Sequence, residues 1–348
     1  RHHTLLGKRR FHKTAFGRCT GVRKTVGNRA ARTGTGGSWK DSVMTNSAIP
    51  GFAIGHWTHP TGRTGCTVIL TDRPAVAVCE VRGGAPGTRE TNLMTAGSLV
   101  RRVDAVLLTG GSAFGLAAAD GVVRWLREHG RGFPTPFLPV PIVAAAVVYD
   151  LNGPDLVFPD AEAGYAACRA ARPDQWRGGR FGAGTATTVG KLLGHQRATP
   201  TGIGTHVLAI EDGHLGVVAV VNAVGNIVDP ATGQIVAGIR ADDGGWIDSR
   251  EAILNLSEPE SAAGTNTTLI AVMTDLALDY HALTRMAIAA HDALARVIRP
   301  AHTILDGDTV FVLAVDETPT PAARIMKIAA ATEIAVERAL LASALTAE

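Results

Sequence analysis

The sequence predicts a layered α/β (α+β) fold, on three observations. Short apolar runs typical of strands alternate along the chain with stretches of helical spacing. The strand runs are apolar without interruption, so each needs cover on both faces, which favours helices packed on sheets over a sandwich or a bundle. The 40 glycines show no collagen period and no heptad register accompanies them, so fibrous architectures are excluded.

The first half of the chain is expected to begin with a hairpin. Residues 66–70 and 76–81 are β-branched runs, and Thr71-Asp72-Arg73-Pro74 between them has turn composition. The next apolar run, 103–108, ends at the pair Gly110-Gly111, and 116–128 has the spacing of a helix. Residues 132–149 carry no charge, but four prolines in their first part would break a spanning helix, so we expect a loop that enters a strand at 143–148.

The second half of the chain shows the same alternation. The polar segment 241–266, with one short helical stretch inside it, is expected to be a mobile surface segment. Asp279 is a plausible N-cap for a helix that Arg299-Pro300 closes. The remaining expected elements are strands at 207–210, 217–221, 267–274 and 309–315, and an Ala-rich helix from about residue 322.

The basic character of the chain belongs to its first 43 residues. They hold 11 of the 34 Lys and Arg and 1 of the 31 Asp and Glu, which leaves 23 basic and 30 acidic residues, a formal net charge of −7, from Met44 onward. Polyanion binding by residues 44–348 is therefore disfavoured, and no nucleic-acid partner is expected.

Residues 1–43 are expected to be a disordered leader. They have no apolar run of signal-peptide length and no periodic pattern, and Met44-Thr-Asn-Ser-Ala-Ile-Pro reads like a natural start. Vector-derived or wrongly assigned upstream sequence is favoured over an Arg-rich transit peptide, which has a similar composition.

The four cysteines show neither CxxC spacing nor a disulfide framework, which favours a reducing, cytoplasmic compartment. No membrane partner is expected. Common enzyme motifs are also missing. Residues 110–115 lack GxSxG spacing, the Gly182-Ala183-Gly184 run lacks the third glycine of a dinucleotide fingerprint, and there is no P-loop or HExxH. No cofactor and no metal are expected.

One junction can carry chemistry, because the polar segment ends abruptly at Asn266-Thr267-Thr268 and a buried strand follows at once. If the chain were cut before Thr267, the hydroxyl of this residue would gain its own base, since an α-amine has a pKa of roughly 7.7–8.0. The cut would follow attack of Thr267 Oγ1 on the Asn266 carbonyl, ester formation and hydrolysis. A threonine that merely begins a strand is the competing interpretation.

Five blocks of sequence, in order, resemble the self-processing L-aminopeptidase/D-esterase family, which includes β-peptidyl aminopeptidases and nylon-oligomer hydrolases. They are VRGGAPGTRET (81–91), LLTGGSAFGLAAADGV (107–122), NAVGNIVDPATG (222–233), NTTLIAVMTD (266–275) and IRPAHTILDGDTVFVLAV (298–315). The resemblance spans about residue 49 to the end, and the Asn-Thr junction is nearest to the nylon-hydrolase branch.

The resemblance implies a single-domain, four-layer αββα sandwich covering residues 44–348. It would be autocleaved into a large part, 44–266, and a small part of 82 residues, 267–348. The processed heterodimers would assemble into a homo-oligomer, often a tetramer.

The resemblance also implies roles for six residues. Thr267 would be the nucleophile and its freed amine the general base, and the Asn222 amide would stabilise the oxyanion. Lys191 would hold the amine neutral and could polarise the substrate carbonyl. Tyr149 would hydrogen-bond near the nucleophile. Asp306 and Asp308 would orient the ammonium group of Lys191 or Thr267.

Each assignment has a structural alternative. Asn222 could form a turn, Lys191 could be a solvated surface residue, and Tyr149 could be core. The Asp306-Gly307-Asp308 run could be only a turn or could hold a divalent metal.

Three functions compete at this point. The first is an autoprocessed amidohydrolase that acts on short peptides, amides or ω-amino-acid oligomers through a Thr267 acyl-enzyme. The second is an acyltransferase of the ornithine acetyltransferase type, whose Ala-Thr-Met-Leu-like junction differs from the one here. The third is an unprocessed scaffold protein. An extra Thr265 before the junction, and pocket segments 133–142 and 241–260 that match no branch strongly, leave the substrate open.

Overall fold

The computed structural model describes residues 48–153, 155–210, 212–256 and 265–345. The leader predicted at 1–43 lies outside the described residues, as does the stretch 257–264 of the segment predicted to be mobile.

Nine strands form one hydrogen-bonded sheet in the order β3-β5-β4-β2-β16-β14-β9-β8, with β1 paired to β2. The pairs β4–β5 and β14–β16 are parallel, and the other pairs of this sheet are antiparallel. The strands are β1 (Phe52–Thr58), β2 (Gly65–Val81), β3 (Thr88–Arg89), β4 (Arg102–Thr109), β5 (Val143–Val147), β8 (Ile203–Ile210), β9 (Gly213–Asn222), β14 (Thr267–Ala277) and β16 (Thr309–Asp316).

The long strand β2 folds this sheet into two layers. Its first part pairs with β1 and β4, its last part pairs with β16, and the register with β4 shifts between Leu70 and Ala75. The hairpin predicted here is therefore wrong, because the chain bends through 71–74 without reversing direction. Thr71 fixes the bend, since its hydroxyl lies 3.0 Å from the carbonyl oxygen of Asp104 on the neighbouring strand.

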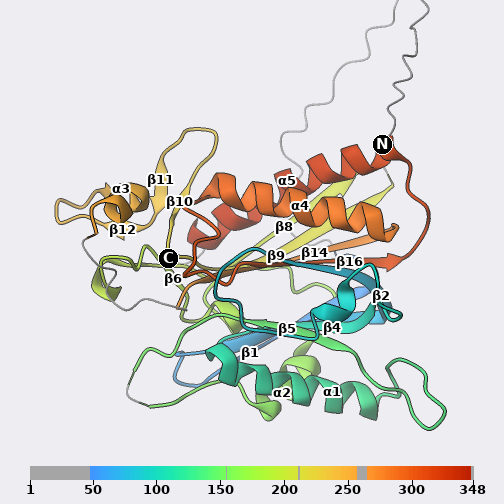
Figure 1. Cartoon of the computed structure of the whole chain (residues 1–348). Helices are drawn as coiled ribbons and strands as arrows, with labels where there is room; N and C mark the ends of the chain where they lie inside the picture. The colour runs from blue at the N-terminus through green and yellow to red at the C-terminus, as the bar shows by residue number, and fades with distance from the viewer. Residues whose placement is uncertain (1–47, 154, 211, 257–264, 346–348) are drawn as a thin grey trace, which may run out of the picture. The chain divides into compact units, whose positions relative to one another are not determined.

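Helices cover both outer faces, which completes the predicted αββα arrangement (Figure 1). The pair α4–α5 lies over β8, β9, β14 and β16, and the pair α1–α2 lies under β1, β4 and β5. The helices are α1 (Ala118–Glu128), α2 (Ala161–Ala170), α3 (Ser249–Leu254), α4 (Tyr280–Val297) and α5 (Ala322–Leu345).

Three apolar cores separate the four layers, and β14 shows how one strand serves two of them. Ile270 and Val272 pack into the core beneath α4 and α5. The alternate residues Leu269, Ala271 and Met273 pack into the core between the two strand layers. Alternating side chains of a strand point to opposite faces, so the uninterrupted apolar run seen in the sequence corresponds to burial on both sides.

Short elements gather near one end of the sheet. They are β6 (Thr188–Val189) paired with β7 (Thr199–Pro200), β10 (Asn226–Val228) with β11 (Ile235–Ala237) and β15 (Ile298–Arg299), and β12 (Ile239–Arg240) with β13 (Trp246–Ile247). Four 3₁₀ helices complete the secondary structure: η1 (Asn92–Met94), η2 (Ser112–Ala117), η3 (Gly182–Gly184) and η4 (His195–Arg197). The buried Asn226 side chain ties this end together, because it bonds the Ile247 carbonyl at 2.8 Å and the Ser249 hydroxyl at 2.6 Å.

Most element predictions are confirmed. Asp279 caps α4 by accepting a hydrogen bond from the Ala282 amide at 2.8 Å. The polar segment 241–256 holds β13 and the short helix α3. The sequence did not predict β1 and α2, nor the short strands and 3₁₀ helices that lie between the main elements. None of the helices in the described ranges has the length and apolar character needed to cross a membrane.

Candidate active site

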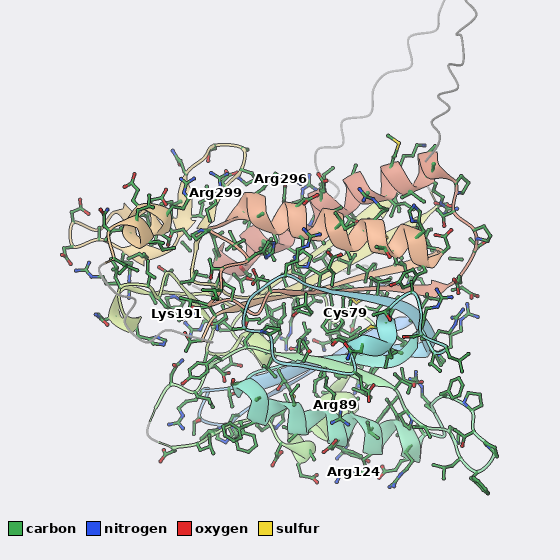
Figure 2. All side chains as sticks on the ribbon, in the orientation of Figure 1. Cys79, Arg89, Arg124, Lys191, Arg296 and Arg299 are labelled. Carbon is green, nitrogen blue, oxygen red and sulfur yellow. The ribbon has the colours of Figure 1, made fainter. Side chains whose placement is uncertain are left out.

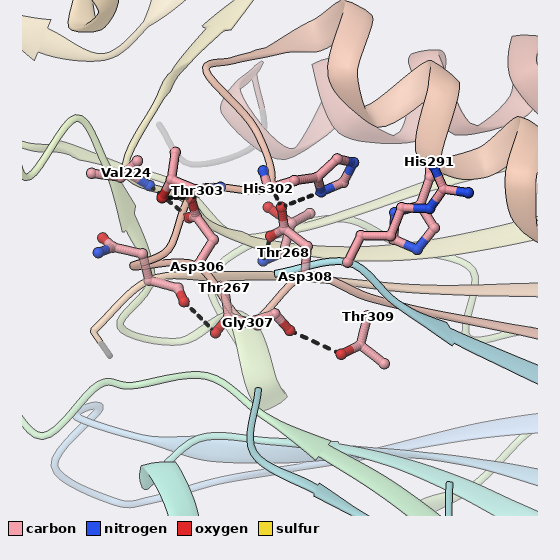
Figure 3. Close-up of polar contacts among 12 residues, drawn as sticks. Val224, Thr267, Thr268, His291, His302, Thr303, Asp306, Gly307, Asp308 and Thr309 are labelled. Atoms are coloured by element: carbon pink, nitrogen blue, oxygen red, sulfur yellow. Dashed lines mark hydrogen bonds and ion pairs between the residues drawn. The ribbon is translucent and has the colours of Figure 1, made fainter. Parts of the chain in front are cut away.

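Three neighbouring strands begin or end at the same end of the sheet, and this brings separate sequence motifs together. β14 begins at Thr267, directly opposite Asn222, the last residue of the antiparallel strand β9. The parallel strand β16 begins at Thr309 on the other side of β14, and an isolated bridge joins Asn266 to Asp306 just before it. The predicted nucleophile and oxyanion donor therefore lie opposite each other. Figure 3 shows the aspartate pair beside Thr267.

The Thr267 hydroxyl lies against the carbonyl group that it would attack. Its Oγ1 donates to the Asn266 carbonyl oxygen at 2.5 Å, and only 5% of the residue is exposed. The Gly307 amide donates to the same oxygen at 2.9 Å. The hydroxyl is thus a direct neighbour of the carbonyl group that it would attack, and such proximity favours an intramolecular reaction.

The buried Asn222 amide is fixed by hydrogen bonds at both ends. Its Oδ1 accepts from Lys191 Nζ at 2.8 Å and from the Thr188 amide at 3.1 Å. Its Nδ2 donates to the carbonyl oxygens of Tyr149 and Thr265, each at 3.1 Å. These four partners determine which way the amide faces, so that one N–H points towards Thr265, two residues before Thr267, and the other towards Tyr149.

The Lys191 ammonium is enclosed among carbonyl oxygens, and Figure 2 shows the residue near β6. Nζ donates to Thr188 O at 3.0 Å, to Asn222 O at 2.8 Å and to Asn222 Oδ1 at 2.8 Å. Burial lowers the pKa of Lys191 to about 7, although the nearby Asp306 carboxylate opposes this shift. Lys191 is thus a buried group that acts directly on Asn222, and the solvated-surface alternative is wrong.

Asp306 joins the start of β16 to the end of β9. Its Oδ1 accepts from the Val224 amide at 3.2 Å, and its Oδ2 accepts from the Thr303 amide at 3.1 Å and from the Thr303 hydroxyl. Burial, helped by the Asp308 carboxylate, raises the pKa of Asp306 to about 6. In the uncut chain this carboxylate makes no hydrogen bond to Lys191 and influences it through space.

Asp308 holds the start of β14 in the same way. Its Oδ1 accepts from the Thr268 amide at 2.7 Å, and its Oδ2 accepts from the His302 amide at 2.9 Å and lies 2.8 Å from His302 Nδ1. His302 has a φ of 55°, and these two bonds stabilise that left-handed conformation. The aspartates thus fix the two strands that carry Asn222 and Thr267.

Tyr149 reaches the site through its backbone. Its carbonyl oxygen accepts from Asn222 Nδ2, whereas its hydroxyl makes no hydrogen bond within the described part of the chain. The contact of its phenol group with the nucleophile stays a prediction.

Several residues that shape the site were not predicted from the sequence. Gly307 was interpreted only as part of a turn, yet a Cβ there would lie 2.7 Å from Thr267 Oγ1. Thr188 contributes its amide and its carbonyl, and His302 and Thr303 hold the aspartates. The His-Thr pair lies inside one of the resembling blocks, and that was the signal available.

A metal site is not formed by these carboxylates. Within the described ranges, no three His, Cys, Asp or Glu side chains are grouped so that they could hold an ion. Asp306 and Asp308 are occupied by backbone amides, a hydroxyl and an imidazole, as described above. What the arrangement offers is a buried hydroxyl beside a carbonyl, with oriented N–H donors around it.

Comparison with known proteins matches almost the whole described region. The profile of peptidase family S58 matches residues 47–348. An "uncharacterized aminopeptidase" of Mycobacterium tuberculosis is 45% identical over 331 residues, covering 86% of this chain and 93% of the relative. The 6-aminohexanoate-oligomer endohydrolase of Kocuria sp. is 33% identical over 278 residues, covering 78% of this chain and 75% of the relative.

Solved structures share the fold at low identity. The L-aminopeptidase D-Ala-esterase/amidase of Ochrobactrum anthropi, described as a variant of the Ntn hydrolase fold, superimposes with a TM-score of 0.64 at 18% identity, covering 87% of each chain. A β-aminopeptidase of Burkholderia sp. gives a TM-score of 0.64 at 19% identity, covering 86% of this chain and 87% of the other.

Proposed function

Because the chain belongs to peptidase family S58 and is an amide-bond hydrolase, we propose that it cuts itself before Thr267 and uses the new terminus as its nucleophile. Family membership confirms the resemblance predicted from the sequence, and the αββα layers are those it implied. The observation that carries the proposal is the 2.5 Å separation between Thr267 Oγ1 and the Asn266 carbonyl oxygen.

Hydrolysis would follow in two stages once the amine is free. The α-amine of Thr267 takes the hydroxyl proton, Oγ1 attacks the substrate carbonyl, and the departing amine receives the proton. Water then attacks the acyl-enzyme by the same route. The Asn222 amide stabilises each oxyanion, while Lys191 holds Asn222 in place and, when charged, favours the neutral form of the adjacent amine.

Short peptides and amides are the proposed substrates. The relatives named as aminopeptidases favour peptides with a free amino terminus, and the relatives named for 6-aminohexanoate oligomers favour linear ω-amino-acid amides. Both classes contain an amide bond that the freed terminus of Thr267 would attack. A panel of dipeptide amides and 6-aminohexanoate oligomers would rank the two classes, and added amine acceptors would detect any acyl transfer.

Thr267→Ala is the decisive test of this function. The variant lacks the attacking oxygen, so we expect one uncut chain and no turnover by intact mass and by amide hydrolysis. Thr267→Ser keeps the hydroxyl and serves as the matched control, which should still be cut. A Thr267→Ala protein found in two pieces split at the same bond would overturn the assignment of the nucleophile.

A further inference from the structure

The carbonyl group of the bond to be cut, between Asn266 and Thr267, takes part in the backbone hydrogen bonding between neighbouring segments. Asn266 and Asp306 form a parallel bridge, and through it the Gly307 amide donates to the Asn266 oxygen at 2.9 Å. This is the oxygen on which negative charge develops when Thr267 attacks. Useful oxyanion donors lie 2.7–3.1 Å from the position that the oxyanion will occupy, and a backbone N–H that already bonds this oxygen in the uncut chain is placed to keep that contact as charge develops.

The two side chains expected to polarise carbonyls are occupied elsewhere in the uncut chain. Asn222 has two amide protons, and they are donated to Tyr149 O and Thr265 O. Lys191 has three ammonium protons, and they are donated to Thr188 O, Asn222 O and Asn222 Oδ1. Neither side chain donates to the Asn266 carbonyl.

We infer that self-cleavage and substrate hydrolysis use different oxyanion donors: the Gly307 amide serves self-cleavage, and the Asn222 amide serves hydrolysis. This inference rests on the proposed function. The Asn222 donor becomes available only when the segment carrying Thr265 leaves, because the Thr265 carbonyl occupies it in the uncut chain. The hydrolytic site is therefore latent until the chain has been cut.

The self-cleavage step balances as follows. Thr267 Oγ1 bonds to the Asn266 carbonyl carbon, and the hydroxyl proton passes to the Thr267 nitrogen as the C–N bond breaks. The products of this step are an ester between Asn266 and Oγ1 and a free amine. Water then splits the ester into the Asn266 carboxylic acid and the Thr267 hydroxyl. The Gly307 N–H bonds the carbonyl oxygen throughout and exchanges no proton.

Glycine at 307 also leaves room for the nucleophile. A Cβ there would lie 2.7 Å from Thr267 Oγ1 and 2.8 Å from the Ala85 carbonyl oxygen. The first contact would displace the attacking hydroxyl, and the second is with backbone that has little freedom to move. One residue thus supplies both the donor and the space.

The direct test removes the Gly307 N–H without adding an atom. Full-length protein is made by cell-free translation with glycolic acid at position 307, so an ester oxygen replaces the amide, and self-cleavage is followed by intact mass. The matched control carries the same replacement at Gly84, whose amide donates to Thr303 O at 3.1 Å, away from the bond to be cut. We expect self-cleavage to slow at least about 10²-fold for 307 and less than tenfold for 84.

Equal rates of self-cleavage for the replacements at 307 and at 84 would overturn the inference. This holds whether both proteins are cut as fast as the parent or both are cut equally slowly. Asn222→Ala gives an independent readout if the ester protein does not fold. Its self-cleavage should stay within about tenfold of the parent while its turnover falls about 10²–10³-fold. Equal losses in both steps would show one shared donor. Cleavage of Thr267→Ala would instead contradict the proposed function itself.

Discussion

At the scale of single residues, the site depends on which hydrogen-bonding groups are already occupied. Asn222 uses all four of its hydrogen-bonding positions. Lys191 is held by hydrogen bonds to the carbonyl oxygens of Thr188 and Asn222 and to Asn222 Oδ1. A resemblance can point to such residues, as it did here for Asn222 and Lys191, which the structure places in contact and whose catalytic roles stay predictions. It could not identify Gly307, since the role of that residue lies in a backbone N–H and in a missing side chain.

Asn222→Asp separates the two functions of the Asn222 side chain. The aspartate keeps oxygen acceptors for Lys191 and Thr188 but has no N–H to donate. If the amide acts as an oxyanion donor, kcat on a dipeptide amide should fall about 10²–10³-fold, as for Asn222→Ala. A kcat close to that of the parent would show that Asn222 serves only to place Lys191.

Lys191 should give the stability of the fold a characteristic pH dependence. Its pKa is about 7 in the folded chain and near 10.5 in the unfolded chain. At a pH between these two values, unfolding is therefore accompanied by the uptake of a proton. Raising the pH opposes that uptake and stabilises the fold by up to about 1.4 kcal/mol per pH unit.

Urea unfolding of Thr267→Ala and of Thr267→Ala/Lys191→Met from pH 7 to pH 10 checks this. Both proteins should remain uncut, so cleavage does not enter the comparison. The protein that retains Lys191 should gain stability relative to the double variant as the pH rises. A constant difference would contradict the depressed pKa.

At the scale of elements, the site forms where β9 ends and where β14 and β16 begin. The sequence predicted these three strands and the residues at their ends. It did not predict that β16 lies parallel to β14 in the register that sets Asp306 beside Asn266, because register depends on partners far apart in the chain. The bend in β2 was not predicted either. Residues 71–74 have turn composition, and only the pairing of β2 with β4, which lies further along the chain, shows that the chain does not reverse there.

The contact between the end of β2 and the Asp306–Asp308 loop gives a test at this scale. A Cβ at Gly83 would lie 2.3 Å from the Asp306 carbonyl oxygen and 2.4 Å from the Asp308 amide, and both contacts are with backbone. Gly83→Ala should therefore displace the loop, slow self-cleavage at least tenfold and cost about 1–3 kcal/mol of stability. Gly97→Ala is the control, since nothing lies within 4 Å of a Cβ there; similar effects from both would contradict the argument.

At the scale of the whole described region, the cut would leave two interlocked parts. The part that begins at Thr267 supplies β14, β16, α4 and α5. The part that ends at Asn266 supplies β9 and β2, which pair with β14 and β16. The four-layer fold was accessible from the sequence because the apolar alternation and the resemblance agree. Assembly into a tetramer stays a prediction.

The cut protein should behave as one particle under native conditions. We expect both fragments to elute together in size-exclusion chromatography and to separate in denaturant. The hydrogen bonds between β14 and β9 and the shared apolar cores hold the two fragments together. N-terminal sequencing of the smaller fragment should begin Thr-Thr-Leu-Ile. Fragments that separate without denaturant, or a different first residue, would contradict this arrangement.

The position of β14 between β9 and β16 has a kinetic consequence. Before the cut, its pairing with β9 is an event within one polymer and does not depend on dilution. After the cut, recovery from denaturation requires two molecules to meet, so its rate should scale with concentration. Breaking one peptide bond would thereby change the molecularity of refolding.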